Sequence, residues 1–142
     1  MVAEPKIEKV IYTARTHTTG GRDHGAARSS DGLLDVKLAS PGAVRIGTNP
    51  EQLFAAGWSA SFESAIALAA RNSKIALGEI TIDAEVDLHL TDGTDCFLSA
   101  RLIISIPGVD HAVAQELVRQ AEQLCPYSKA TRDNINVTLS VL

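Results

Sequence analysis

The sequence is short of the residues that several common classes of protein require. Two cysteines among 142 residues are too few for a disulfide-stabilised scaffold. A formal net charge of -4 offers no basic face, so we expect no nucleic acid as a partner. Aromatic residues make up 4% of the chain and hydrophobic residues 45%, which predicts a mainly aliphatic core in a globular protein.

A targeting signal and a membrane span are also absent from the predicted features. Residues 1–6 (Met1-Val2-Ala3-Glu4-Pro5-Lys6) show neither the basic start nor the apolar run of a signal peptide. We therefore expect a cytoplasmic protein, in which a cysteine is catalytic or inert rather than structural. Residues 53–70 are rich in apolar residues, but Glu63 and three serines interrupt them, so we expect a buried core helix and no membrane.

The pattern of strands and helices predicts an α+β protein in the order βββ-α-ββ-α-β, built as a single domain over residues 1–142. Strands are expected at residues 9–18, 27–30, 33–38, 80–90, 96–106 and 135–142, with antiparallel pairing. Asp31-Gly32 and residues 91–95 are the expected hairpin turns, and residues 20–25 are expected to form a flexible loop.

Two helices are predicted from periodicity and end signals. The first is expected from Pro50 to about Asn72, because Asn49 is a favoured N-cap and Gln52 can complete a capping box. The second has apolar residues at helical spacing over residues 113–124 and is expected to stop at Pro126.

Ser61 is expected about three turns into the first helix, among small residues. Residue type alone favours a packing role, with the hydroxyl bonded to a backbone carbonyl one turn earlier. A serine hydrolase is not supported, because residues 57–61 do not form a G-x-S-x-G elbow. No base is placed near Ser61 by spacing either, since the four histidines are scattered over His17, His24, His89 and His111.

The two cysteines are expected in different environments. Cys125 is predicted at the C-terminal end of the second helix, where the helix dipole disfavours a thiolate. It would be a poor attacking thiol but suits a resolving role, in which it condenses with a sulfenic acid formed elsewhere. The alternative is a buried, inert cysteine. Cys96, beside Phe97 in a predicted strand, is expected in the core.

Arg22 and Glu51 are the charged candidates for a site. Arg22 lies among glycines, where its guanidinium could approach an anion; a solvated surface arginine is the alternative. Glu51, in the first turn of the first helix, either complements the helix dipole or orients the Arg22 guanidinium by pairing with it.

Three motifs together resemble the organic hydroperoxide resistance proteins (Ohr), a branch of the Ohr/OsmC thiol peroxidases, in order and spacing. They are Thr19-Gly20-Gly21-Arg22-Asp23, the stretch from Gly47 to Gly57 that contains Asn49-Pro50-Glu51-Gln52-Leu53-Phe54, and Cys125-Pro126-Tyr127-Ser128-Lys129-Ala130-Thr131-Arg132. The resemblance implies an Ohr/OsmC-like fold, with antiparallel sheets packed around two central helices in an intertwined homodimer.

The resemblance also assigns roles to single residues. In this family a helix cysteine attacks the peroxide, a later cysteine resolves it, an arginine lowers the thiol pKa and stabilises the leaving oxygen, and a glutamate holds the arginine. Cys125, Arg22 and Glu51 occupy the last three positions. Ser61 stands where the family has its attacking cysteine. A single substitution among intact motifs is more typical of a deliberate trapping mutation than of gradual divergence, and the sequence allows both.

The implied activity is thiol-dependent reduction of organic hydroperoxides to alcohols, with fatty-acid or aryl-alkyl peroxides as substrates. A lipoylated protein or dihydrolipoamide is the implied reductant, and no metal, nucleotide or other cofactor is expected. A serine hydroxyl loses its proton far less readily than a thiol does, so it does not supply the attacking anion at neutral pH. The chain as written is therefore predicted to be inactive. One alternative is a non-catalytic relative that binds or senses apolar acids or peroxides. Another is an OsmC-type peroxidase, although Cys125-Pro126-Tyr127-Ser128 favours Ohr.

Helix geometry adds an expectation about assembly. Glu51 and Ser61 are ten residues apart on one predicted helix, which separates their backbones by about 15 Å along its axis. Within one chain Arg22 would have to bridge most of that gap. A symmetric homodimer would instead let Glu51 and Arg22 of one chain meet Ser61 and Cys125 of the other, so we expect sites shared between chains.

Overall fold

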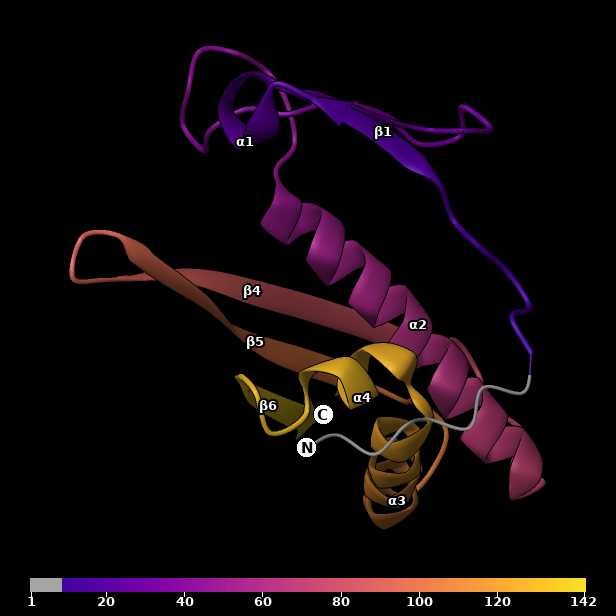
Figure 1. The fold of residues 1–142 in the computed structure, drawn as a ribbon. Coiled ribbons are helices and arrows are strands. Elements are labelled where there is room, and N and C mark those ends of the chain that lie inside the picture. The colour runs from indigo at the N-terminus through magenta and orange to yellow at the C-terminus, as the bar shows by residue number, and fades with distance from the viewer. Residues whose placement is uncertain (1–8) are drawn as a thin grey trace. The chain divides into compact units, whose positions relative to one another are not determined.

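The computed structural model describes residues 9–142, so residues 1–8, which include the segment inspected for a signal peptide, lie outside it. The chain divides into two compact units, Met1–Pro50 and Glu51–Leu142. Figure 1 shows the elements of each.

The first unit contains a three-stranded antiparallel sheet in the order β1-β2-β3. Its strands are β1 (Thr16–Thr19), β2 (Ala26–Ser29) and β3 (Asp35–Lys37). The hairpin expected at Asp31-Gly32 is confirmed: the Asp31 carboxylate accepts hydrogen bonds from the Ser29 hydroxyl (2.6 Å) and the Leu33 N–H (3.0 Å). These bonds lower the pKa of Asp31. Gly32 has φ of 75°, the left-handed conformation that favours glycine in a tight turn.

Two predictions in this unit are wrong. The strand expected over residues 9–18 is limited to β1, because the ladder with β2 ends at the Thr16–Ser29 pair and β-branched composition alone does not form a strand. The loop expected at residues 20–25 contains a single helical turn, α1 (Gly21–His24). Gly25 closes this turn so tightly that a Cβ there would lie 2.1 Å from the Gly21 carbonyl oxygen.

The second unit contains a second three-stranded sheet in the order β4-β5-β6. Strands β4 (Thr81–Thr91) and β5 (Asp95–Ser105) form the expected antiparallel hairpin. Strand β6 (Asn136–Val141) runs parallel to β5, so the expectation of antiparallel pairing fails for this pair. The physical reason is the connection: a helical crossover returns the chain to the same end of the sheet, as parallel pairing requires.

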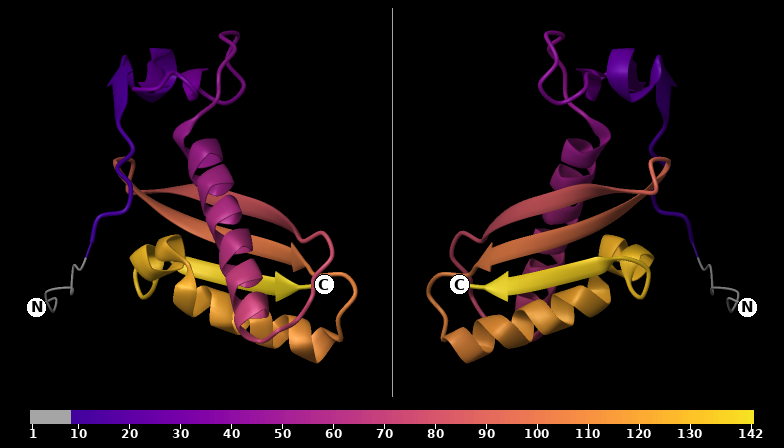
Figure 2. Two further views of the ribbon diagram at one scale, coloured as in Figure 1. Left: turned by 90° about the vertical axis from the view of Figure 1, so that its right-hand side faces the viewer. Right: turned by 90° about the vertical axis from the view of Figure 1, so that its left-hand side faces the viewer.

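Helices α2 (Pro50–Asn72) and α3 (His111–Leu124) begin and end where the sequence predicts. Both helices pack into a single apolar core against one face of the β4-β5-β6 sheet (Figure 2). They therefore cover the same face of this sheet. Helix α4 (Pro126–Thr131) was not predicted. Pro126, which was expected only to stop α3, also starts α4, because proline fits the first position of a helix.

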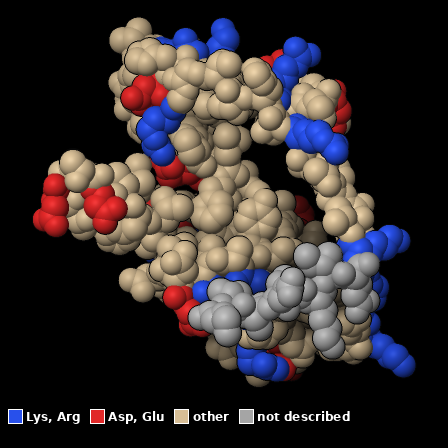
Figure 3. Space-filling view, in the orientation of Figure 1, with Lys and Arg blue, Asp and Glu red and all other residues tan. Residues whose placement is uncertain are grey.

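Helix α2 is the one helix among residues 9–142 that is long and apolar enough to cross a membrane by length and composition. Its buried residues belong to the core, as expected of a core helix: Trp58, Phe62, Ala65, Ile66, Ala69 and Ala70. Charged side chains of both signs are scattered over a mostly uncharged face in Figure 3, and acidic ones gather at the tip of the β4–β5 hairpin, where the sequence has Asp92 and Asp95.

Candidate active site

The structure brings together two of the four predicted site residues, Ser61 and Cys125. Ser61 lies on α2, and its Oγ is 3.6 Å from the Sγ of Cys125, which is 64 residues away in sequence. Ser61 is half-buried and Cys125 is fully buried. The packing role expected for the Ser61 hydroxyl belongs instead to Ser59, whose Oγ donates to the Ala55 carbonyl at 2.8 Å.

Cys125 is mounted on a backbone that is held on both sides. Its N–H donates to the Ala121 carbonyl at 2.8 Å, and its own carbonyl accepts from the Lys129 N–H at 3.0 Å. Cys125 is both the C-cap residue of α3 and the N-cap residue of α4. The predicted position of Cys125 at the C-terminal end of a helix is confirmed. The N-terminal end of α4, which begins at the next residue and has the opposite dipole sign, was not predicted.

Other residues near the pair in sequence, which were not predicted as part of the site, also join these segments. The Trp58 Nε1–H donates to the Ser128 hydroxyl at 3.3 Å, which links α2 to α4. The ring of Phe54 lies 5.3 Å from that of Trp58 and 6.2 Å from that of Tyr127. The i, i+4 spacing of Phe54 and Trp58 was the available signal for an aromatic cluster, but nothing in the sequence connects it with residues 127 and 128.

Arg22 and Glu51 are placed on separate elements. Arg22 is an exposed residue of α1 in the first unit, and Glu51 is a half-buried residue in the first turn of α2. Along α2, Glu51 lies about 15 Å from Ser61, since each residue adds roughly 1.5 Å. The pairing of Arg22 with Glu51 and their action on position 61 remain predictions.

The prediction that Cys96 lies in the core is wrong, because its side chain is exposed. Cys96 is paired with Leu90 across the β4–β5 hairpin, close to its turn. Leu90 is 64% exposed, so this end of the hairpin extends beyond the part of the sheet that the helices cover.

Cavities and metal-binding groups do not indicate a different centre. A cavity of about 590 Å³ beside α2 is lined by neither Ser61 nor Cys125, but by other residues of α2, among them Ala60, Glu63 and Arg71, and by Ile75 and residues 77–80. Within the part of the chain that the structure describes, no three His, Cys, Asp or Glu side chains are grouped so that they could hold a metal ion. The Ser61–Cys125 pair places a hydroxyl against a thiol.

Comparisons with known proteins identify the family of the chain. Residues 39–140 match the OsmC-like protein family. An organic hydroperoxide resistance protein from Xanthomonas axonopodis pv. citri (strain 306) is 49% identical over 139 residues, covering 94% of this chain and 96% of the relative.

Solved structures agree with the sequence comparisons. An organic hydroperoxide resistance protein from Legionella pneumophila has a TM-score of 0.88 at 43% identity, covering 94% of this chain and 98% of that one. The organic hydroperoxide resistance protein OhrB of Bacillus subtilis has a TM-score of 0.87 at 37% identity, covering 94% of this chain and all of that one (100%). The chain therefore belongs to the OsmC-like family, among the organic hydroperoxide resistance proteins.

Proposed function

We propose that this chain carries the site of a thiol-dependent organic hydroperoxide reductase in which position 61 attacks the peroxide and Cys125 resolves the product. The observation that carries the proposal is the 3.6 Å approach of the Ser61 Oγ to the Cys125 Sγ. The relatives named for resistance to organic hydroperoxides support organic hydroperoxides as the substrate class.

The reaction requires sulfur at position 61. A thiolate there attacks the terminal peroxide oxygen, the O–O bond breaks, and the alkoxide leaves as an alcohol after taking a proton. The resulting sulfenic acid condenses with the Cys125 thiol, which forms a disulfide and releases water. A dithiol then reduces the disulfide and becomes a cyclic disulfide itself. Ser61 cannot form the sulfenic acid, so the chain as written is inactive in this proposal.

The rest of the proposal comes from the resemblance. Arg22 lowers the pKa of the attacking thiol and stabilises the leaving oxygen, and Glu51 holds Arg22. A lipoylated protein or dihydrolipoamide supplies the electrons, and the protein acts as a homodimer. Its cytoplasmic location is the expectation drawn above from cysteine usage and residues 1–6. The exposed apolar residues of the first unit, including Ile11, Leu33 and Val44, are consistent with a surface that an associating chain would cover.

Steady-state turnover of cumene hydroperoxide with dihydrolipoamide tests the proposal. Ser61→Cys is expected to turn over, whereas the chain as written and a Ser61→Ala control should not exceed the rate without protein. Adding Cys125→Ser to Ser61→Cys should abolish dithiol-supported turnover. Each chain should still react rapidly with one molecule of peroxide. A folded Ser61→Cys protein that consumes no hydroperoxide would contradict the peroxidase assignment and favour a binding or sensing role.

A further inference from the structure

We propose that Trp58 and Ser128 are positioning residues for disulfide formation: their hydrogen bond fixes α4 against α2 so that Cys125 faces position 61. The inference rests on the proposed function for its biological meaning, but the geometry can be tested without it. Neither residue is expected to touch the peroxide in the attacking step.

Two contacts join α2 to the segment formed by Cys125 and α4, and these contacts are one helical turn apart. Trp58 precedes position 61 by three residues on α2, and Ser128 follows Cys125 by three residues into α4. The Trp58–Ser128 hydrogen bond and the Ser61–Cys125 contact therefore lie on neighbouring turns of two segments that pair in opposite chain directions. A displacement of α4 along α2 would change both distances together.

The hydrogen bond is the directional part of this contact. Trp58 is 1% exposed and Ser128 6%, so water cannot easily replace either partner. A buried donor left without a partner is costly, which favours the one register in which the bond forms. The neighbouring contact of Tyr127 with Gly57 is close but non-directional: a Cβ at position 57 would meet the Tyr127 hydroxyl at 3.1 Å. Such a packing contact tolerates sliding better than a hydrogen bond does.

A disulfide forms only within narrow limits of distance, so its formation depends on the register of α4 against α2. The sulfur atoms must come to about 2.05 Å, with the Cβ atoms about 3.8 Å apart. The Cys125 backbone is tied to Ala121 and Lys129, so the thiol moves with α3 and α4 rather than independently. Fixing α4 against α2 therefore raises the effective concentration of the Cys125 thiol at position 61.

The test uses the full chain with Ser61→Cys, and compares Ser128→Ala, Trp58→Phe and the two combined. Ser59→Ala is the matched control, because it removes a hydroxyl from α2 whose hydrogen bond stays within the helix. Equilibration with reduced and oxidised glutathione measures the effective concentration of the two thiols. In this exchange one oxidised glutathione accepts two electrons from the protein dithiol and leaves as two reduced molecules.

Each single substitution is expected to lower the effective thiol concentration about 2- to 10-fold, the range that corresponds to one hydrogen bond. The double variant should fall little further, because both changes remove the same bond. Ser59→Ala should leave the effective thiol concentration unchanged. If Trp58→Phe does not fold, Ser128→Ala against Ser59→Ala still decides the question.

Urea unfolding of the reduced proteins separates positioning from general stability. A lowered unfolding midpoint with an unchanged glutathione equilibrium would overturn the proposal, as would equal losses in Ser59→Ala or additive losses in the double variant. Because glutathione exchange involves no peroxide, a protein that forms the disulfide normally yet ignores hydroperoxide would count against the proposed function alone.

Discussion

At the scale of single residues, one atom decides what this site can do. Cys125 is buried and faces position 61, where a second thiol would complete a redox pair. An ordinary thiol has a pKa near 8.5 and can be made largely thiolate by a neighbouring cation, whereas no comparable shift brings a serine hydroxyl into the neutral range. In the proposed function, Cys125 is therefore a resolving thiol without its partner.

The two thiols of the chain as written should differ sharply in reactivity. Cys96 is exposed and Cys125 is buried, so under native conditions a thiol reagent should label Cys96 quickly and Cys125 only as fast as the protein opens. Brief exposure to peroxide should leave Cys125 reduced. Labelling of the denatured protein is the control and should detect both thiols. Equal labelling rates, or an intrachain Cys96–Cys125 crosslink by mass spectrometry, would contradict this placement.

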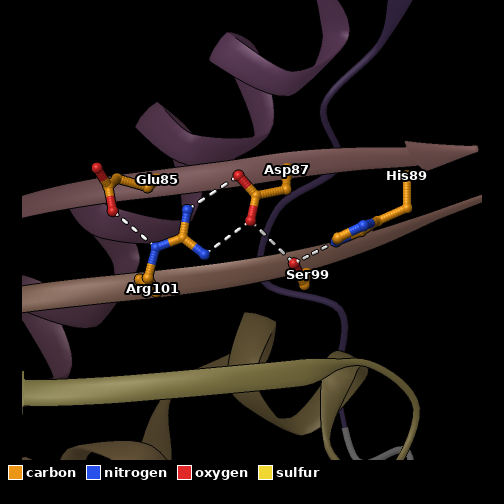
Figure 4. Close-up of polar contacts among 5 residues, drawn as sticks. All are labelled: Glu85, Asp87, His89, Ser99 and Arg101. Atoms are coloured by element: carbon orange, nitrogen blue, oxygen red, sulfur yellow. Dashed lines mark hydrogen bonds and ion pairs between the residues drawn. The ribbon is translucent and has the colours of Figure 1, made fainter.

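At the scale of elements, the β4–β5 hairpin carries a polar network on the strand face opposite the core (Figure 4). The Arg101 guanidinium donates to both Asp87 oxygens at 2.7 and 2.9 Å and to Glu85 Oε1 at 2.7 Å. The Ser99 hydroxyl donates to Asp87 at 3.0 Å, and the His89 Nε2 lies 2.7 Å from the Ser99 oxygen. Since Ser99 has one hydrogen to donate, this network assigns the donor role to the His89 Nε2–H.

The stability of the hairpin should depend on pH through Asp87. Hydrogen bonds from Arg101, and then from Ser99, lower the pKa of Asp87 to about 2. The unfolded chain, with an Asp pKa of about 3.9, binds the proton more readily, so stability rises with pH in this window. The contribution of Asp87 should thus be complete above about pH 4 and disappear as the pH falls through about 2.

Urea unfolding of the chain as written and of Asp87→Asn, followed from pH 5 to pH 2, measures this contribution. The difference in unfolding free energy should shrink as the pH falls, and Asp83→Asn, on the same strand, controls for loss of charge alone. A difference that stays constant over this range would show that the network does not depend on the Asp87 carboxylate.

The elements that could be predicted from sequence are those determined by local patterns. Periodicity and end signals predict α2 and α3, and alternation with a turn predicts the β4–β5 hairpin. The parallel pairing of β6, the truncation of β1 and the exposure of Cys96 depend on contacts between distant residues, which local patterns do not encode. The turn α4 was missed because proline is read first as a stop signal.

The candidate site shows the same division. The resemblance identified positions 61 and 125 as partners, and the structure supplies their 3.6 Å separation. Trp58 and Ser128 carry no signal in the sequence, because their hydrogen bond joins residues 70 positions apart. The placement of Arg22 relative to position 61 stays a prediction.

At the scale of the whole molecule, the proposed homodimer raises the question of which chain supplies the arginine. Glu51 is too far along α2 to act directly on position 61. A twofold-symmetric dimer would place Glu51 and Arg22 of one chain at position 61 of the other. This arrangement predicts that two separately inactive chains can complement each other.

Complementation is tested by co-refolding the chain as written with a variant that carries both Arg22→Ala and Ser61→Cys. Each homodimer lacks either the thiol or the arginine, so both should be inactive. In the heterodimer the thiol of one chain can meet Arg22 of the other, and hydroperoxide turnover should appear. Confirmed heterodimers that stay inactive would place the arginine and the thiol of a site within one chain.

The most direct test of the central claim is the mass and disulfide content of Ser61→Cys after one equivalent of cumene hydroperoxide without reductant. We predict the loss of two hydrogen atoms per chain and a disulfide that joins position 61 to Cys125, with cumyl alcohol formed in equal amount. Unchanged mass and unconsumed peroxide, or a crosslink through Cys96 in place of Cys125, would contradict the account.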